Sequence, residues 1–195
     1  MNLTTVFNFI REKKGYPIPF SYKIINNLPI SKDELTVNGN LYIRFVKKEV
    51  ILPDNLTING NLDLRYSNIS KLPENLTVTG SLNIRNTKIT ELPKSLTVID
   101  SLEMKDTQIS KLPDNLKLKG YLSIDYCKNI KQLPDNLTVP ALWMYDTVIR
   151  EIPNNLNVSD VIAINNSWLA NNYTFGQIKE LILQKGGTPP NSIIK

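Results

Sequence analysis

Apolar and polar residues alternate along most of this chain, and the alternation recurs about every 20 residues. In the stretch that begins at Leu72, the apolar positions are Leu76, Val78, Leu82 and Ile84. Such alternation is typical of extended chain with one buried face. A unit this short cannot bury its apolar side alone, whereas stacked copies can. The pattern therefore predicts a β-solenoid.

The repeated unit reads LPxNLxVxGxL in its clearest form, where x is any residue. Its copies start at Leu52, Leu72, Leu92, Leu112, Leu133 and Ile152. A less regular copy covers residues 35–51. We therefore expect about seven coils of about 20 residues over 35–169, stacked at the usual strand spacing of about 4.8 Å. Residues 1–195 are expected to form a single domain, with helical caps at 1–34 and 170–195.

Amphipathic segments flank the repeats and predict short capping helices, because a solenoid must cover the open ends of its core. The N-terminal stripe, which Gly15 would end, consists of Leu3, Val6, Phe7 and Ile10. The C-terminal stripe consists of Phe175, Ile178, Leu181 and Ile182. Thr174 is the expected N-cap of that second helix, and Gly186–Gly187 its stop. The last segment, residues 188–195, is expected to be a loose tail.

Two polar columns are expected to satisfy backbone groups in the turns. The first follows the proline corners by two residues and consists of Asn55, Asn75, Ser95, Asn115, Asn136 and Asn155. The second marks the end of each strand and consists of Ser67, Thr87, Thr107, Cys127, Thr147 and Ser167. Both columns are interpreted as structural.

The repeats resemble leucine-rich repeats of the short bacterial LPX type. The pattern L-x-x-L-x-L-x-x-N/C-x-L is carried by Leu82, Ile84, Thr87, Ile89, Leu92 and Pro93. The chain departs from the family in having Thr or Ser at most asparagine positions, with Cys127 the one familiar variant. It also has an L-x-V-x-G segment that suggests a second strand per coil. Repeats of this kind are similar to those of phage-encoded and bacterial proteins of unassigned role, which implies a microbial or viral origin.

Composition narrows the chemistry that this chain can perform. The 195 residues include one cysteine and no histidine, so four-ligand zinc sites and histidine-based catalysis are excluded in their usual forms. No catalytic residue, metal site or cofactor is predicted. No apolar run approaches the roughly 20 residues of a membrane span, and no signal peptide is evident. We expect a cytoplasmic protein, in the host cytoplasm if it is phage-encoded, with no membrane partner.

The outward positions of the strands are the candidate binding surface, since leucine-rich repeats bind partners on their concave face. One column is cationic and consists of Arg44, Arg65, Arg85 and Lys105. The aromatic candidates around it are Tyr42, Tyr66, Tyr121, Tyr126, Trp143 and Tyr145. The cations form either an anion-binding stripe or a solvated row compensated by Asp63 and Glu103. Trp143 belongs either to a binding patch or to the packing around Pro140, where one residue is missing.

Three functions follow from these alternatives. The leading one is a non-catalytic protein that binds a protein partner. The resemblance suggests that this partner is a host or defence protein, for example a defence nuclease that the chain inhibits. The second is nucleic-acid or polyanion binding along the cations, with Tyr42, Phe45 and Tyr66 as stacking surfaces. It is disfavoured by the carboxylates of the same face, which are Asp63, Glu103, Asp106, Asp125 and Asp146. A remote third is a carbohydrate-active enzyme using Asp63 with Arg65, or Asp125 with Asp146.

Overall fold

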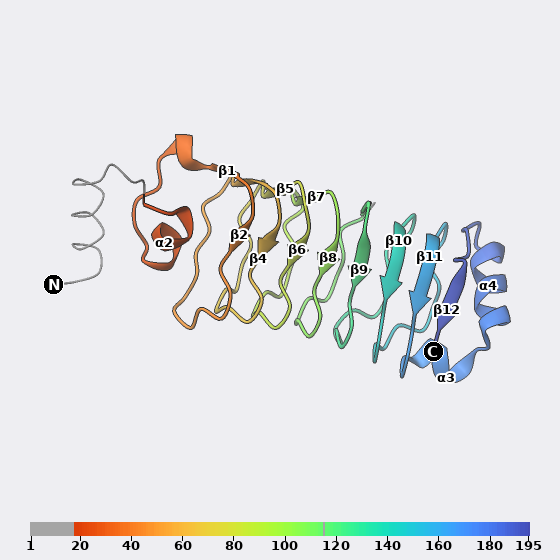
Figure 1. The fold of residues 1–195 in the computed structure, drawn as a ribbon. Coiled ribbons are helices and arrows are strands. Elements are labelled where there is room, and N and C mark those ends of the chain that lie inside the picture. Colours follow the sequence, from red (N-terminus) through yellow and green to blue (C-terminus); the bar gives the residue numbers. More distant parts are fainter. Residues whose placement is uncertain (1–17, 115) are drawn as a thin grey trace.

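The computed structural model describes residues 18–114 and 116–195, and it shows a parallel β-solenoid of about six turns with a spacing of about 20 residues (Figure 1). The predicted fold class is confirmed, including short helices at the ends, whereas the expected number of about seven coils is not. The N-terminal stripe of Leu3, Val6, Phe7 and Ile10, its stop at Gly15, and Asn115 of the turn column lie outside the described residues.

Two parallel sheets run along the solenoid. The shorter sheet, in spatial order, contains β1 (Thr36–Asn38), β3 (Thr57–Asn59), β5 (Thr77–Val78) and β7 (Thr97–Val98). Its strands come from the L-x-V-x-G segments, so the predicted second strand is present in four turns, whereas residues 138–143 and 157–163 each form one continuous strand through both segments. The longer sheet contains β2 (Leu41–Tyr42), β4 (Leu62–Asp63), β6 (Leu82–Asn83), β8 (Leu102–Glu103), β9 (Tyr121–Ser123), β10 (Thr138–Trp143), β11 (Asn157–Ala163) and β12 (Ser192–Ile194).

Equivalent positions of successive repeats stand opposite one another in both sheets. Leu62 pairs with Leu82, which pairs with Leu102, which pairs with Leu122. A one-residue slip would turn the leucines outward, so the apolar alternation fixes this register. Between the described strands β10 and β11 the register shifts beside Pro140, between Val139 and Ala141. Proline has no N–H to donate to the ladder, which accounts for the irregularity at this point.

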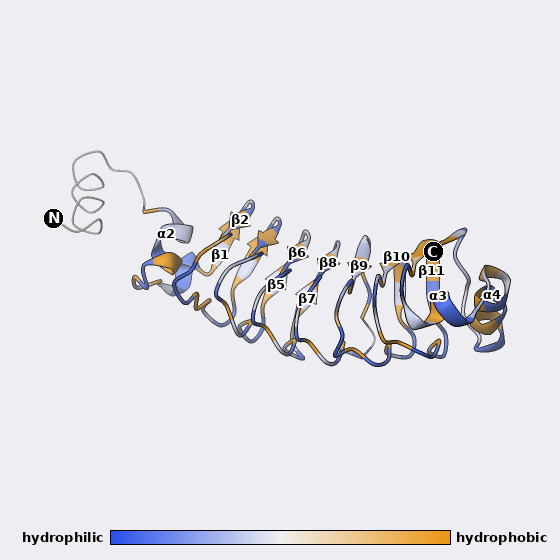
Figure 2. Ribbon diagram, turned by 90° about the horizontal axis from the view of Figure 1, so that it is seen from below, coloured by the Kyte–Doolittle hydropathy of each residue, from blue (hydrophilic) through white to orange (hydrophobic). Residues whose placement is uncertain are grey.

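The core fills the space between the two sheets and the turns. In each turn the alternating apolar residues point inward, and Figure 2 shows apolar segments recurring along the length of the body. In the second unit the fully buried side chains are Leu72, Leu76, Val78, Leu82, Ile84 and Ile89. The solenoid is therefore held by one continuous apolar core.

The polar column at the strand ends has the predicted structural role. Thr87 Oγ1 donates a hydrogen bond to the backbone carbonyl of Ile84 at 2.7 Å, three residues earlier, and Thr147 does the same to Met144 at 3.1 Å. Ser67 makes the equivalent bond. Cys127 Sγ instead reaches the previous turn and donates to the Met104 carbonyl at 3.1 Å. These buried side chains donate hydrogen bonds to backbone carbonyls that lie at the bend and have no partner in the sheet.

The asparagine column acts in part as predicted, since Ser95 Oγ accepts a hydrogen bond from the backbone N–H of Asn75 at 2.8 Å, and in part differently. Four of its members adopt left-handed backbone, and these are Asn55, Asn75, Asn136 and Asn155. Their side chains bond to one another, as Asn75 Nδ2 does to Asn55 Oδ1 at 3.0 Å. The backbone N–H groups of the turns are bonded by preceding aspartates, such as Asp54, which accepts from Glu74 N at 2.9 Å. Asparagine is retained because it tolerates the left-handed region.

Short helices lie at both ends of the described solenoid. These are α2 (Phe20–Ile25), the 3-10 helix η1 (Lys32–Glu34), α3 (Trp168–Asn172) and α4 (Phe175–Gln184). Thr174 caps α4 in a capping box with Gln177, and Gly186 beyond its end has a φ of 76°, both as predicted. Within the described part of the chain, no helix is long and apolar enough to cross a membrane.

Two expectations about the C-terminal segment are wrong. Residues 188–195 are not loose, because β12 pairs in parallel with β11 and extends the longer sheet. The alternating Ser-Ile-Ile pattern allows this, since Ile193 is buried while its neighbours are exposed. Phe175 does not belong to the buried stripe of α4, which rests on Ile178 and Ile182. It is exposed, with Lys195 Nζ 5.4 Å from its ring centre.

Candidate functional site

The outer face of the longer sheet, defined here by the outward side chains from Tyr42 to Asn166, is the candidate site. Three residues after the end of each strand of the longer sheet from β2 to β11, one residue adopts left-handed backbone, and these residues are Phe45, Tyr66, Asn86, Asp106, Tyr126, Asp146 and Asn166. Asparagine and aspartate are common in this conformation, but bulky aromatic residues are rare there. Three of the seven are nonetheless aromatic, and all three are exposed.

The cationic column is compensated by carboxylates beside it. Asp63 Oδ2 lies 2.8 Å from Arg44 Nε and 3.4 Å from Arg65 Nε, so one carboxylate serves two arginines. Glu103 Oε1 lies 3.7 Å from Arg85 Nη1. These pairs confirm that Asp63 and Glu103 offset the arginines, as the sequence suggested. Partly exposed pairs of this kind each stabilise the fold by only about 0.2–1 kcal/mol.

Aromatic rings gather at the two ends of the outer face. Phe45 and Tyr66 stack with ring centres 5.2 Å apart and planes 7° apart. Tyr121 and Trp143 stack at 4.7 Å and 13°. Trp143 does not cover the irregularity at Pro140, because it leans on Tyr121 and is absent from the residues lining the hollow beside that proline.

Cations lie against the rings of the same face. The Arg44 guanidinium is 4.3 Å from the centre of the Tyr42 ring. Arg85 is 5.4 Å from the Tyr66 ring, and Lys105 Nζ is 4.9 Å from the Tyr126 ring. Contacts of this type stabilise by about 0.5–1 kcal/mol at exposed sites and hold the long cationic side chains in place.

A shallow groove of about 210 Å³ crosses the middle of the outer face. Tyr42 closes one end and Tyr121 the other, while three strands with small polar residues form the floor. Asn83 Nδ2 donates to Glu103 Oε2 at 2.8 Å, and the Tyr121 hydroxyl approaches the same oxygen at 3.4 Å. Burial and the nearby Glu103 carboxylate raise the pKa of Tyr121, so this hydroxyl stays a donor at neutral pH.

Of the two pairs drawn from the sequence as catalytic, Asp63 and Arg65 do lie together, whereas Asp125 and Asp146 are engaged in other contacts. Asp125 is buried and accepts hydrogen bonds from Tyr145 N at 2.8 Å and Ser123 Oγ at 3.2 Å. Its burial raises its pKa above the ordinary range. Asp146 forms an ion pair with Lys128 at 2.6 Å. In the described residues, no group of three or more His, Cys, Asp or Glu side chains could hold a metal ion.

The predicted binding residues therefore form two groups, one separate pair and one outlier. The first surrounds the cations and consists of Tyr42, Arg44, Arg65, Tyr66 and Arg85. The second consists of Tyr121 and Trp143, and Lys105 with Tyr126 lies between the two groups. Tyr145 is half-buried, and its ring joins neither group. Its backbone N–H donates a hydrogen bond to Asp125. The site also includes Asn83 and Phe45, and the pairing of Phe45 with Tyr66 was visible in the sequence as two rings one repeat apart.

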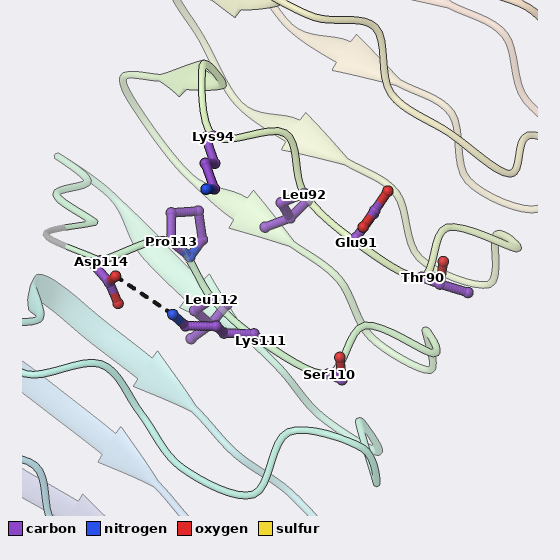
Figure 3. A pocket seen from close by; sticks show the side chains of 9 residues that line it. All are labelled: Thr90, Glu91, Leu92, Lys94, Ser110, Lys111, Leu112, Pro113 and Asp114. Carbon is purple, nitrogen blue, oxygen red and sulfur yellow. Dashed lines mark hydrogen bonds and ion pairs between the residues drawn. The ribbon is translucent and has the colours of Figure 1, made fainter.

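A further groove lies away from the outer face. It measures about 490 Å³ and runs between the Leu-Pro segments of two successive turns, residues 90–94 and 110–114 (Figure 3). Lys111 and Asp114 form an exposed ion pair at 3.5 Å across its wall. Similar grooves occur between other pairs of turns. This groove is thus a product of stacking the repeat, and it includes none of the predicted binding residues.

Comparisons with protein-family models, with curated proteins and with solved structures gave no match to this chain.

Proposed function

We propose that this chain is a non-catalytic binding protein that uses the outer face of its longer sheet to bind another protein. The observation that carries the proposal is the presence of two stacked ring pairs on one face, Phe45–Tyr66 and Tyr121–Trp143, in which Phe45, Tyr66 and Trp143 are exposed and Tyr121 is half-buried. Exposed aromatic clusters are characteristic of interaction surfaces, and Trp and Tyr dominate binding hot spots. The resemblance to LPX-type leucine-rich repeats supports the same use of this face.

The charges between the ring pairs favour a protein over a nucleic acid. Asp63 and Glu103 are paired with the arginines of the column, which leaves fewer free cations to neutralise phosphates. Nucleic-acid surfaces depend on many uncompensated Lys and Arg contacts. A face of mixed charge with aromatic anchors is instead typical of protein interfaces.

The resemblance to microbial repeats also suggests which kind of partner is bound. The repeat style is similar to that of phage-encoded and bacterial proteins, so the partner is proposed to be a microbial host or defence protein in the cytoplasm. A non-catalytic role accords with carboxylates that are tied to arginine, to lysine or to backbone N–H groups rather than facing one another.

The test is a capture experiment followed by a direct affinity measurement. The immobilised chain is exposed to bacterial lysate, and each captured protein is purified and titrated against the wild type and the Tyr121→Ser/Trp143→Ser double variant. Loss of a hot-spot aromatic pair is expected to weaken binding of the true partner at least tenfold.

The matched control is Leu183→Ser, which removes an exposed apolar side chain from α4. This control is expected to bind the partner as the wild type does. The proposal is wrong if the double variant binds every captured protein with unchanged affinity, or if Leu183→Ser weakens binding as much.

A further inference from the structure

The first two turns of the outer face share a combination of side chains that later turns lack. In each, an arginine at the strand end is followed directly by an aromatic ring, as Arg44–Phe45 and Arg65–Tyr66. The third and fourth turns keep the cation but have asparagine or aspartate after it. The fifth turn keeps a ring but has aspartate in place of the cation. The four residues Arg44, Phe45, Arg65 and Tyr66 are called the arginine clamp below.

The two guanidinium groups of the clamp are oriented by one carboxylate beneath them. Asp63 Oδ2 lies 2.8 Å from Arg44 Nε and 3.4 Å from Arg65 Nε, which is within ion-pair distance, although neither Nε makes a hydrogen bond. The Tyr42 ring, 4.3 Å away, supports the Arg44 guanidinium. A guanidinium held in this way presents parallel N–H donors, and two such donors match the two oxygens of a carboxylate.

The clamp keeps a net positive charge after this pairing. Two arginines face one aspartate, which leaves one unbalanced cation. The Asp63 side chain is also deeper than its partners, with 12% of its surface exposed against 34% for Arg44 and 33% for Arg65. A partner that approaches from solvent therefore meets the cations first, and the local field favours an anion.

The rings of the clamp are held in a costly backbone conformation. Phe45 and Tyr66 both have a φ of 58°, in the left-handed region that bulky residues avoid. The same position carries asparagine or aspartate in four of the five other turns, and these residues adopt it easily, while the remaining turn has Tyr126. Strained residues that persist are characteristic of functional positions. The strain also leaves the stacked pair exposed beside the guanidinium groups, with Phe45 60% accessible to solvent.

We propose that the arginine clamp binds an aspartate or glutamate side chain of the partner protein, with an apolar neighbour of that residue lying against the Phe45–Tyr66 pair. This inference rests on the proposed function, to which it adds the chemistry of the bound segment. Carboxylate and phosphate oxygens could both fit such donors, and the clamp is assigned to carboxylate because its net charge is small and one aspartate already shares it.

The test uses short fluorescent peptides rather than the natural partner. The acidic probe carries an Asp-Glu-Tyr segment in a Gly/Ser context, and the reference probe carries Asn-Gln-Tyr instead. Fluorescence anisotropy is expected to show at least tenfold tighter binding of the acidic probe, because charge-assisted hydrogen bonds are lost in the reference. The difference is expected to shrink at high salt.

Three variants separate the clamp from general electrostatics. Arg44→Gln/Arg65→Gln is expected to abolish the preference for the acidic probe, while Arg150→Gln, which removes an exposed arginine elsewhere, leaves it intact. Asp63→Asn keeps the shape of the site and raises its charge, so it is expected to tighten acidic-probe binding several-fold. A circular-dichroism spectrum of each variant shows whether it is folded. If the double variant unfolds, binding of the acidic probe to Asp63→Asn still tests the proposal.

The proposal is overturned by equal binding, or no binding, of the two peptides up to about 1 mM. It is also overturned if a phosphoserine peptide or an oligothymidine binds at the clamp more tightly than the acidic peptide. Failure of the proposed function looks different, since the captured partner would then be insensitive to Tyr121→Ser/Trp143→Ser. If the partner is lost on that change while the clamp variants have no effect, only the clamp proposal is wrong.

Discussion

Three positions after each strand of the outer face, one residue adopts left-handed backbone. Where that residue is aromatic, its backbone is strained and its ring is exposed to solvent. Tyr126 has a φ of 61° and an exposed ring, with Lys105 Nζ as its neighbour at 4.9 Å. Asparagine adopts this backbone with less strain than tyrosine. The Tyr126 ring therefore lowers the stability of the fold, whereas a residue that serves packing is expected to raise it.

Replacing that ring is expected to leave the fold at least as stable. Tyr126→Asn relieves strain of about 1 kcal/mol and removes a cation–π contact of about 0.5–1 kcal/mol, so the free energy of unfolding should rise slightly or stay constant. Urea denaturation measures it. A loss of more than about 1 kcal/mol would show that Tyr126 is a structural residue instead.

Asp125 gives the fold a pH dependence of defined sign. Its burial raises its pKa, so the folded state holds a proton that the unfolded chain releases above its ordinary pKa of about 3.9. The contribution of Asp125 to stability therefore falls as the pH rises from about 4 through its folded pKa. Asp125→Asn keeps an acceptor for Tyr145 N and removes this decline.

The measurement is the difference in unfolding free energy between Asp125→Asn and the wild type at several pH values. The unfolding free energy of the variant is expected to rise relative to that of the wild type as the pH rises from acid to neutral. A difference that is constant with pH, or that moves in the opposite direction, would contradict the assignment of a raised pKa to Asp125.

At the scale of the element, β12 closes the end of the solenoid. Its central residue, Ile193, is 8% exposed and pairs with Ile162 of β11, while the next residue, Ile194, is 47% exposed. Ile193→Ala is expected to lower the free energy of unfolding by about 2–5 kcal/mol, whereas Ile194→Ala changes it by about 0.5 kcal/mol or less. Thermal denaturation of the two variants provides the comparison, and equal effects would mean that β12 does not pack as described.

The sequence predicted the elements where the repeat is regular and failed where it ends. Alternation from Leu76 to Ile84 was enough to give the strands, their register and the core, because stacking equivalent positions is the one way to bury them all. β12 was missed because Ser192–Ile194 is too short to show a period, and its pairing depends on α4 returning the chain to the sheet.

The candidate site was predictable in composition and less so in geometry. Columns of cations and rings follow directly from a period of about 20, and so does the nearness of Asp63 to the arginines. The sequence could not show that Asp63 takes two arginines through Nε, or that Phe45 and Tyr66 share left-handed backbone. Those features depend on side-chain rotamers and on the bend at the end of each strand.

At the scale of the whole molecule, the account makes one face of the solenoid the binding surface. The core takes the inward half of every strand, and the Leu-Pro grooves merely repeat with the turns. The outer face alone differs from one end to the other, with the arginine clamp near α2 and the Tyr121–Trp143 pair toward α4. A partner that spans both would bind in one orientation only.

Site-specific photo-cross-linking to the captured partner tests this central claim most directly. A photoreactive phenylalanine analogue is placed at Phe45 or Trp143 on the outer face, and at Ile51 or Leu183, which are at least as exposed, elsewhere. The account predicts cross-links to the partner from Phe45 and Trp143 and none from Ile51 and Leu183. Cross-links from Ile51 or Leu183, with none from the outer face, would contradict it.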